Sequence, residues 1–392
     1  MTSLELSRHL FDGCDAFSLN HLTPLTSKHG VMAAELADLV AASGGLLALR
    51  EAGRSLEGRS INLVTFGRGP STVLLWSQMH GDEPTATLAL MDIFAFLSKS
   101  AGEPWVQRML ADVTVHVLPM LNPDGAERFR RYTSAEIDMN RDARALATPE
   151  ARLLREAQRT LRPSFGFNLH DQGLSSVGSS PRVTAVSLLA PAVDEARTLP
   201  MVRVKAMRLA ALTARILGQF ARGHVATYDD AYEPRAFGDG MQSWGTSTLL
   251  IESGQWPGDP EKRFIRKLNY VAILTGLKAI GDGTYQDVDL DEYTSLQPNG
   301  KRMMDIIVRG AALALDSGST ATVDLGFMAQ PGNLMTTEIP TAVSPYALRE
   351  IGDLRDYGAL VTIDASARSL SARSVAVDKT FTLNQLKDLL QL

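Results

Sequence analysis

The sequence lacks the features of disulfide-bonded, secreted or membrane-spanning proteins. Cys14 is the only cysteine among 392 residues, so no disulfide can form within the chain. No run approaches the roughly 18 apolar residues that a membrane-spanning helix needs. Residues 1–15 mix charges with apolar residues and have neither the basic start nor the apolar core of a signal peptide. We therefore expect a cytoplasmic protein.

Neither sign of charge dominates the chain. There are 39 Lys and Arg residues against 44 Asp and Glu residues, which gives a net charge of -5 without long runs of one sign. Binding to nucleic acid or to an anionic membrane relies on basic patches. We therefore expect neither partner and favour a peptide or another small molecule as the substrate. No pattern in the sequence specifies an oligomeric state.

The chain has the composition and texture of a globular α/β protein. Hydrophobic residues make up 45% and charged residues 21%, as in ordinary folded chains, and the length favours two domains over one. Over residues 1–289, strand-like runs alternate with helix-like segments, which indicates an α/β domain. From residue 290, short apolar runs are separated by Gly, Ser and Pro. This change predicts a smaller β-rich domain over 290–392.

Apolar runs and helical spacing predict the individual elements. In the first domain we expect strands at 61–66, 72–77 and 113–121, and helices at 84–97, 149–161, 200–220 and 263–280. In the second domain we expect strands at 303–309, 311–315, 321–327 and 359–363, followed by a short helix at 383–390.

The first cluster of chemical interest is the turn that contains His80 and Glu83, between an expected strand and an expected helix. Side chains at this spacing in such a turn can converge on one cation. Zinc accepts imidazole nitrogen together with carboxylate oxygen, and three protein ligands leave one position for water. A surface turn can carry the same two residues, so the pair alone does not establish a metal site.

Two further clusters stand at strand ends. His170 ends an apolar strand, where it can add a third ligand to the same cleft, although a single histidine at a strand end is usually structural. Glu252 follows the apolar run 249–251, and burial there raises the pKa of a carboxyl group toward that of a general base. Its alternative is a glutamate with a charged partner. The coincidence of the clusters in one α/β domain favours a zinc-dependent hydrolase.

Six signatures follow one another between about Arg54 and Gly254. They are Ser55-Leu56-Glu57-Gly58-Arg59, the His80 and Glu83 turn, Asn122-Pro123-Asp124-Gly125, Asp138-Met139-Asn140-Arg141, His170 and Glu252. With these motifs the region resembles the zinc metallocarboxypeptidases of the carboxypeptidase A type, including their shorter bacterial members. The resemblance implies a mixed central sheet flanked by helices. It also implies one Zn²⁺ per chain, held by His80, Glu83 and His170, with Glu252 as the base that deprotonates the attacking water.

The resemblance implies roles for the residues around the metal. Asn140 and Arg141 match the pair that grips the substrate's terminal carboxylate, a task that suits a guanidinium fork; a structural salt bridge is the alternative for Arg141. Arg131 matches the arginine that polarises the scissile carbonyl, with Arg130 as its rival. Asp138 matches the carboxylate that orients the first zinc-binding histidine, and a helix cap is its alternative.

The assignments on the substrate side leave alternatives open. Tyr232 is assigned to the mobile tyrosine that covers the substrate, with Tyr228 as the competing choice. Residues 237–240, Phe-Gly-Asp-Gly, are expected near the specificity pocket, where Asp239 either favours a basic group or braces the loop. Asp82 stands where the digestive members of the family carry an arginine. The way these members bind residues upstream of the cut therefore does not carry over.

These features favour a metallocarboxypeptidase that hydrolyses the C-terminal amide bond of a peptide. The alternative is a deacylase of small N-acyl amino acids, similar to aspartoacylase and the desuccinylases, because it shares the metal motif and the carboxylate grip. A non-catalytic peptide-binding module is disfavoured because Glu252 would then be a buried charge without a task. The resemblance ends before residues 290–392, for which we assign no family.

Overall fold

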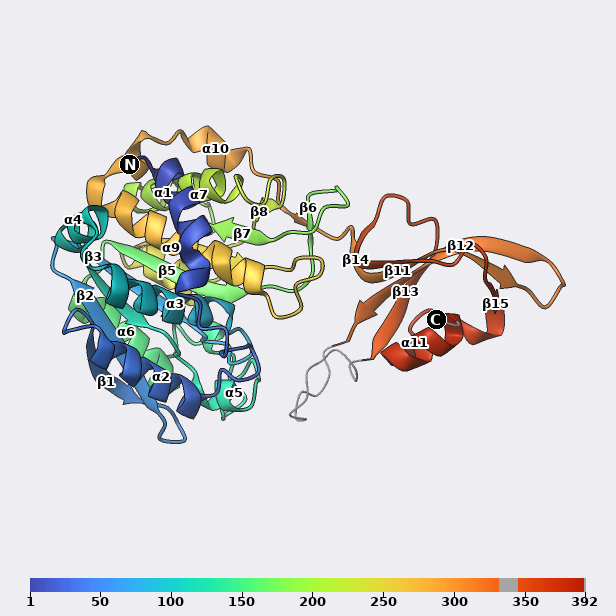
Figure 1. Cartoon of the computed structure of the whole chain (residues 1–392), viewed down its shortest axis with the longest axis horizontal. Coiled ribbons are helices and arrows are strands. Elements are labelled where there is room, and N and C mark those ends of the chain that lie inside the picture. Colours follow the sequence, from blue (N-terminus) through green and yellow to red (C-terminus); the bar gives the residue numbers. More distant parts are fainter. Residues whose placement is uncertain (331–344, 391–392) are drawn as a thin grey trace. The chain divides into compact units, whose positions relative to one another are not determined.

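The computed structural model describes residues 1–330 and 345–390, which form two compact units (Figure 1). The first unit comprises Met1–Gln172, Ala185–Gly254 and Glu261–Pro298, and the second comprises Gly173–Thr184, Gln255–Pro260 and the described part of Asn299–Leu392. This division differs from a single boundary at residue 290. The first unit extends to Pro298, and a loop from the first part of the sequence belongs to the second unit, where β6 (Ser176–Val177) pairs with β10 (Asn299–Gly300).

An eight-stranded mixed sheet forms the centre of the first unit (Figure 1). Its strands in spatial order are β1 (Ala48–Arg54), β2 (Ser60–Gly67), β4 (Val113–Leu118), β3 (Ser71–Ser77), β5 (Phe165–Asp171), β9 (Ser247–Ser253), β7 (Val186–Leu189) and β8 (Val225–Thr227). The four strands β4, β3, β5 and β9 are parallel. Antiparallel pairs join β1 to β2, β2 to β4 and β7 to β9. The predicted mixed sheet is confirmed.

Helices cover both faces of the central strands, so these strands are almost entirely buried. Near-continuous apolar runs are typical of such parallel strands. On one face, Phe167 of β5 reaches Gly276 of α9, which packs with α3 and α7. On the other face, Trp76 of β3 shares an apolar core with Leu154 of α6 and Phe237 of α8. These helices are α3 (Thr85–Ser100), α6 (Pro149–Leu161), α7 (Met201–Leu217), α8 (Phe237–Ser243) and α9 (Arg263–Asp282).

The helices predicted from spacing occur with small shifts at their ends. The helix predicted at 149–161 has the same bounds in the structure, because Thr148 caps its first turn and Pro149 takes the first helical position. The strand predicted at 113–121 ends earlier, at Leu118. The remaining helices of the first unit are α1 (Ser3–Gly13), α2 (His29–Ala42), α4 (Pro104–Asp112), α5 (Pro123–Glu127) and α10 (Leu290–Thr294).

The second unit contains a six-stranded sheet, which confirms the predicted β-rich region. Its strands are β14 (Gly358–Asp364), β11 (Met303–Ala314), β12 (Thr320–Ala329), β13 (Tyr346–Gly352) and β16 (Thr380–Phe381), with β15 (Ser369–Ser371) beside β11. Helix α11 (Leu383–Leu390) adds Leu386 to the core. The prediction of separate strands at 303–309 and 311–315 was wrong. They form one strand, because Gly310, with φ of +69°, lies in a bulge.

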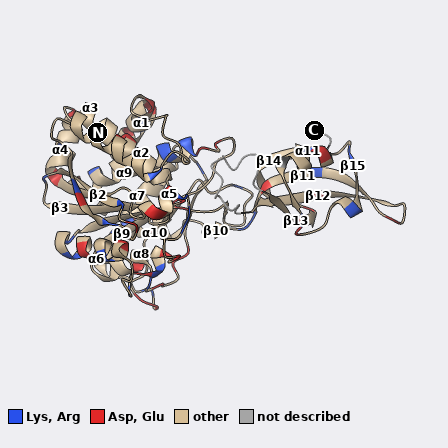
Figure 2. Cartoon of the chain, turned by 90° about the horizontal axis from the view of Figure 1, so that it is seen from below, with Lys and Arg blue, Asp and Glu red and all other residues tan. Residues whose placement is uncertain are grey.

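Charged residues of both signs are interspersed along the elements of both units (Figure 2). Within residues 1–330 and 345–390, no helix combines the length and apolar character that crossing a bilayer requires. The cytoplasmic location and the absence of a nucleic-acid partner stay predictions.

Candidate active site

The carboxyl ends of three neighbouring strands carry the site. Strands β3, β5 and β9 are adjacent and parallel, so their ends meet at one edge of the sheet. His80 lies just after β3, and His170 of β5 stands opposite Glu252 of β9 in the strand register. In open α/β sheets, ligands bind at this edge. The fold therefore brings together three of the predicted residues that lie far apart in the sequence.

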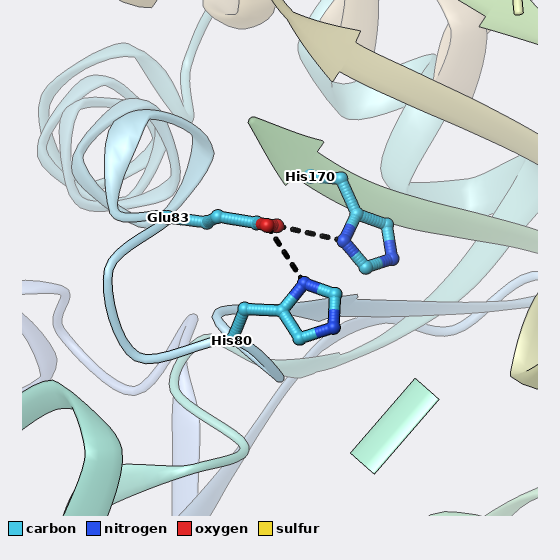
Figure 3. A group of neighbouring side chains, drawn as sticks. All are labelled: His80, Glu83 and His170. Carbon is cyan, nitrogen blue, oxygen red and sulfur yellow. Dashed lines mark hydrogen bonds and ion pairs between the residues drawn. The ribbon is translucent and has the colours of Figure 1, made fainter. Parts of the chain in front are cut away.

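Both imidazole rings face the carboxylate of Glu83 (Figure 3). His80 Nδ1 lies 2.7 Å from Oε1, and His170 Nδ1 lies 2.8 Å from Oε2. The side chains are buried, and one ligand atom from each lies within 4.8 Å of the others. Ligands about 2.1 Å from a tetrahedral Zn²⁺ are roughly 3.4 Å apart, so small shifts would bring them to one ion. Two imidazoles and a carboxylate thus fit zinc with a fourth position left open.

The charge states of the cluster suit a cation. Burial favours a neutral Glu83, but the two imidazoles outweigh burial and hold its pKa well below the usual range. Burial lowers the pKa of His170 and so keeps its ring neutral, as metal ligation requires. Burial acts in the same direction on His80, but Glu83 and Asp138 outweigh it and raise the pKa of His80 to about 9. Zinc and a proton therefore compete for this ring.

A strained turn after β3 carries the first two ligand candidates. Gln78 adopts a φ of +52°, which is uncommon for a residue with a side chain, and its amide donates to the Gly81 carbonyl at 3.0 Å. A Cβ at Gly81 would lie 2.0 Å from the carbonyl carbon of Gly125, so the close approach requires glycine. Asn122 donates to the Met79 carbonyl at 3.1 Å. The Asn-Pro-Asp-Gly motif therefore supports the ligand turn.

Residues 55–59 contact the Asn-Pro-Asp-Gly motif through its aspartate, Asp124, which is fully buried. Asp124 accepts hydrogen bonds from Ser55 Oγ at 2.7 Å, the Glu57 backbone amide at 3.0 Å and Arg59 Nη1 at 2.8 Å. These bonds tie the loop between β1 and β2 to the turn that supports the ligands. Two of the six sequence signatures are thus structural supports of the site.

Asp138 links the ligand cluster to the substrate-side turn. Its Oδ1 accepts from His80 Nε2 at 3.1 Å and from the Asn140 backbone amide at 2.9 Å, so it orients the ring and caps the short 3-10 helix Met139–Arg141. Burial favours a neutral Asp138, but His80 and Arg131 outweigh burial and hold its pKa well below the usual range. Asp138 thus makes both the contact with His80 and the helix cap, and its role in orienting a metal ligand stays a prediction.

The structure brings Arg131, and not Arg130, to the cluster. Arg131 Nη1 lies 3.2 Å from Glu83 Oε1, and its Nη2 donates to Asp138 at 3.0 Å. Arg130 instead pairs with the exposed Glu136 at 2.7 Å. The Arg131 side chain is 37% exposed, so it is held in place and remains accessible to a ligand.

Glu252 is a buried carboxyl group without a charged partner. Among residues 1–330 and 345–390, no Lys, Arg or His side chain forms an ion pair with it. Burial raises the pKa of Glu252 well above its usual range, and the charges of Glu83 and Asp171 add to this effect. The alternative of a charge-paired glutamate therefore does not apply. A raised carboxyl pKa beside a cation site is typical of a general base.

Asn140 and Arg141 follow Asp138 in the turn that contacts the cluster through His80. Asn140 Oδ1 accepts from the Phe237 backbone amide at 2.9 Å, which joins this turn to the start of α8. Arg141 is exposed, with its Nε 3.6 Å from Glu233. An exposed ion pair contributes about 0 to 1 kcal/mol. Glu233 therefore leaves the Arg141 guanidinium able to bind another carboxylate.

The surroundings of the site contain Tyr228 rather than Tyr232. Burial raises the pKa of Tyr228, and the charges of Glu252 and Glu83 raise it further, so its hydroxyl group lies within their field. Among the residues that the structure describes, neither tyrosine forms a hydrogen bond or ion pair with the ligand cluster, so only the effect of these charges on Tyr228 separates the two. The structure thus favours the competing choice for the covering tyrosine.

Asp239 braces the loop before α8, because its Oδ1 accepts from the Glu233 backbone amide at 3.2 Å. Burial raises the pKa of Asp239 to about 6. This hydrogen bond matches the bracing alternative, and a role of Asp239 in specificity stays a prediction.

Sequence reasoning missed Asp171, the residue after the third ligand candidate, His170. Its backbone amide donates to Glu83 Oε2 at 3.2 Å, while its carboxylate binds Thr85 at 2.5 Å and Lys262 at 3.1 Å. These contacts fix the position of the Glu83 carboxylate. The position of Asp171 directly after His170 was the only signal in the sequence that it lies at the site. Its contact with Lys262 can be seen only in the folded chain.

Comparison with known families gives a match for part of the first half of this chain. Residues 32–172 match the family model described as zinc carboxypeptidase, and this span includes His80, Glu83 and His170. Over these residues the chain is similar to the zinc carboxypeptidases. The matched model is that of a zinc-dependent family, and the His-Glu-His cluster is a possible metal site here. Glu252 lies beyond the matched residues, so its place rests on the strand register.

Individual carboxypeptidases are similar to parts of the chain. Carboxypeptidase 2 of Trichophyton rubrum is 29% identical over 143 residues, which cover 34% of this chain and 26% of the relative. Carboxypeptidase Z of Homo sapiens is 32% identical over 84 residues, which cover 19% and 13%. This chain therefore spans about a quarter or less of the length of these relatives.

Solved structures of the family share the fold. Carboxypeptidase A from Helicoverpa armigera matches with a TM-score of 0.53 and 18% identity, over 71% of this chain and 80% of that one. Thrombin activatable fibrinolysis inhibitor matches with a TM-score of 0.54 and 11% identity, over 72% and 81%. At these identities the similarity extends to the fold alone, and it agrees with the mixed sheet flanked by helices.

We predict that Asp138→Ala lowers zinc affinity about 10- to 100-fold, the usual effect of losing a partner that orients a metal-binding histidine. Competition with a chromophoric chelator measures the affinity. Asp289→Ala is the matched control, because Asp289 caps α10 in the same way through the Asp291 amide. Unchanged zinc affinity in Asp138→Ala would leave this residue with the capping role only.

Proposed function

We propose that this protein is a zinc-dependent carboxypeptidase that hydrolyses the C-terminal amide bond of a peptide. The observation that carries the proposal is the convergence of His80, Glu83 and His170 beside Glu252, a buried carboxyl group with no ion-pair partner among the residues that the structure describes. One Zn²⁺ per chain would be held by the first three residues. A bound zinc ion supplies positive charge that favours ionised Glu252 and lowers the pKa of water toward about 7.

The residues of the chain divide the remaining chemistry. Glu252 accepts a proton from the attacking water and passes it to the leaving amine, a task that suits its raised pKa. Arg131 is held by Asp138 beside the cluster, where it donates to the carbonyl oxygen as negative charge develops on that atom. Tyr228 lies within the field of the same groups and is the better candidate to cover the substrate.

Arg141 would bind the terminal carboxylate of the substrate, so the enzyme would act at the end of a peptide chain. Its guanidinium is exposed and only weakly paired, and a guanidinium fork can bind a carboxylate through two parallel hydrogen bonds. The adjacent Asn140 is fixed to the start of α8, which sets the position of this turn. The substrate's terminal carboxylate would therefore bind between this turn and the ligand cluster.

We predict that Arg141→Met lowers kcat/KM by about 10- to 150-fold for peptides with a free terminal carboxylate, because a charged hydrogen bond contributes roughly 1.5 to 3 kcal/mol. Amidated peptides should lose much less. The matched control is Arg144→Met, which removes another exposed arginine from the same segment. Equal losses for both substrate forms would contradict the proposed anchor. Turnover of N-acyl amino acids without turnover of any peptide would favour the deacylase alternative.

A further inference from the structure

The face of the sheet beside the ligand cluster contains buried polar groups with unmet hydrogen bonds. Asn168 of β5 is fully buried, and neither its Nδ2 nor its Oδ1 has a partner among the residues that the structure describes. The same holds for Trp76 Nε1 and Gln242 Nε2. Leaving a buried polar group unpaired costs about 1 to 3 kcal/mol, and folded proteins contain few such groups. Several of them on one face therefore call for an occupant.

The strand register places Asn168 and its neighbour Trp76 in the layer beneath His170. Side chains two residues apart on a strand point to the same face, roughly 7 Å apart. Asn168 therefore lies one layer below His170 on the same face of β5. In the register, Asn168 stands between Trp76 of β3 and Leu250 of β9, just as His170 stands beside Glu252.

Helix α8 covers this face and connects it to the carboxylate-binding turn. A Cβ at Gly238 would lie 3.4 Å from Asn168 Nδ2, so the glycine presents no side chain to the amide. Gln242, one turn further on, is anchored because its Oε1 accepts from the Thr248 amide at 2.7 Å, which leaves its Nε2 as a free donor. The first residue of α8, Phe237, is the one that binds Asn140. A side chain on the residue gripped by Arg141 would thus lie beside this helix.

We propose that Asn168 determines the preference for the substrate's terminal residue, and that this residue carries a side-chain carboxylate or carboxamide. This inference rests on the proposed carboxypeptidase function. Three of the four unpaired atoms are donors, on Trp76, Asn168 and Gln242, and Asn168 Oδ1 is the one acceptor among them. Oxygen-bearing side chains satisfy such donors. An apolar side chain would leave them all unpaired, and a lysine or arginine side chain would match Oδ1 alone.

The test compares kcat/KM of the zinc-loaded full-length protein for blocked dipeptides that end in Glu, Gln, Leu or Lys. Wild type should prefer the Glu and Gln substrates to the Leu substrate by about 10-fold or more, since a site built for hydrogen bonds rejects a side chain without them. Asn168→Leu should reduce this ratio about 10-fold or more. Gln158→Leu is the control, because it removes a buried amide on α6 that bonds Trp244 and Thr246 instead.

A wild-type preference for the Leu or Lys substrate would overturn the proposal. An unchanged ratio of kcat/KM between the Glu or Gln substrates and the Leu substrate in Asn168→Leu would also overturn it. That result is expected if the unpaired groups bind only buried water. If Asn168→Leu does not fold, Gly238→Ala decides, because alanine suits a helix and its methyl group narrows the space beside Asn168. It should penalise the Glu and Gln substrates more than a Gly-terminated one, and equal penalties would overturn the proposal. No zinc-dependent turnover of any peptide would instead contradict the carboxypeptidase function.

Discussion

Replacing Glu252 by glutamine should lower kcat by about 100- to 10,000-fold while zinc stays bound, because a general base that also returns the proton contributes this much. Glutamine keeps the size of the side chain but cannot accept the proton. Among the described residues, no cation forms an ion pair with Glu252, and the unfavourable charges of Glu83 and Asp171 outweigh the favourable ones of His80 and Arg131. The neutral variant should therefore fold at least as stably as wild type, which separates a catalytic loss from a structural one.

Glu150→Gln provides the matched control for this experiment. Glu150 is buried like Glu252, and burial raises its pKa, but its Oε1 accepts from the Leu56 backbone amide, outside the ligand cluster. Its replacement should leave kcat close to wild type. Zinc content, thermal stability and single-turnover rates are measured for both variants. Near-normal turnover in zinc-loaded Glu252→Gln would exclude Glu252 as the base and would require another proton acceptor.

The central strands could be predicted because burial on both faces requires continuous apolar runs, as in the run that precedes Glu252. The edge strand β1 could not be predicted, because none of its residues is buried and its sequence, ALREAGR, contains three charged residues and no β-branched or aromatic residue. The single strand β11 was divided into two because a bulge at Gly310 resembles a loop in sequence. The pairing of β6 with β10 joins segments far apart in the chain, which no local pattern reveals.

The candidate site shows the same contrast between local pattern and long-range contact. His80, Glu83, His170 and Glu252 follow apolar runs that end at one edge of a parallel sheet, so their convergence could be expected from the sequence. Neighbours in irregular segments could not be separated, because no period fixes the direction of their side chains. Only the folded chain shows that Arg131 lies at the cluster while Arg130 does not.

Replacing His170 by alanine should remove zinc from the protein, because the loss of one of three ligands leaves a neutral imidazole and a carboxylate to hold the ion. The affinity should fall further than the roughly 10- to 100-fold expected for a partner that only orients a ligand, such as Asp138. Elemental analysis after dialysis measures the metal content. A second readout is thermal stability, since an ion that binds only the folded state stabilises it. A chelator should therefore lower the Tm of wild type but not that of His170→Ala.

His116→Ala is the matched control for the loss of an imidazole. His116 lies on β4 and shares a hydrogen bond of 2.9 Å with Thr65 on the neighbouring strand β2, so it belongs to the sheet and not to the cluster. This variant should retain one zinc per chain and the chelator-dependent shift in Tm. Stoichiometric zinc in His170→Ala would remove His170 from the ligand set. The zinc ion would then have to be held by His80, Glu83 and a third residue outside the cluster that the fold brings together.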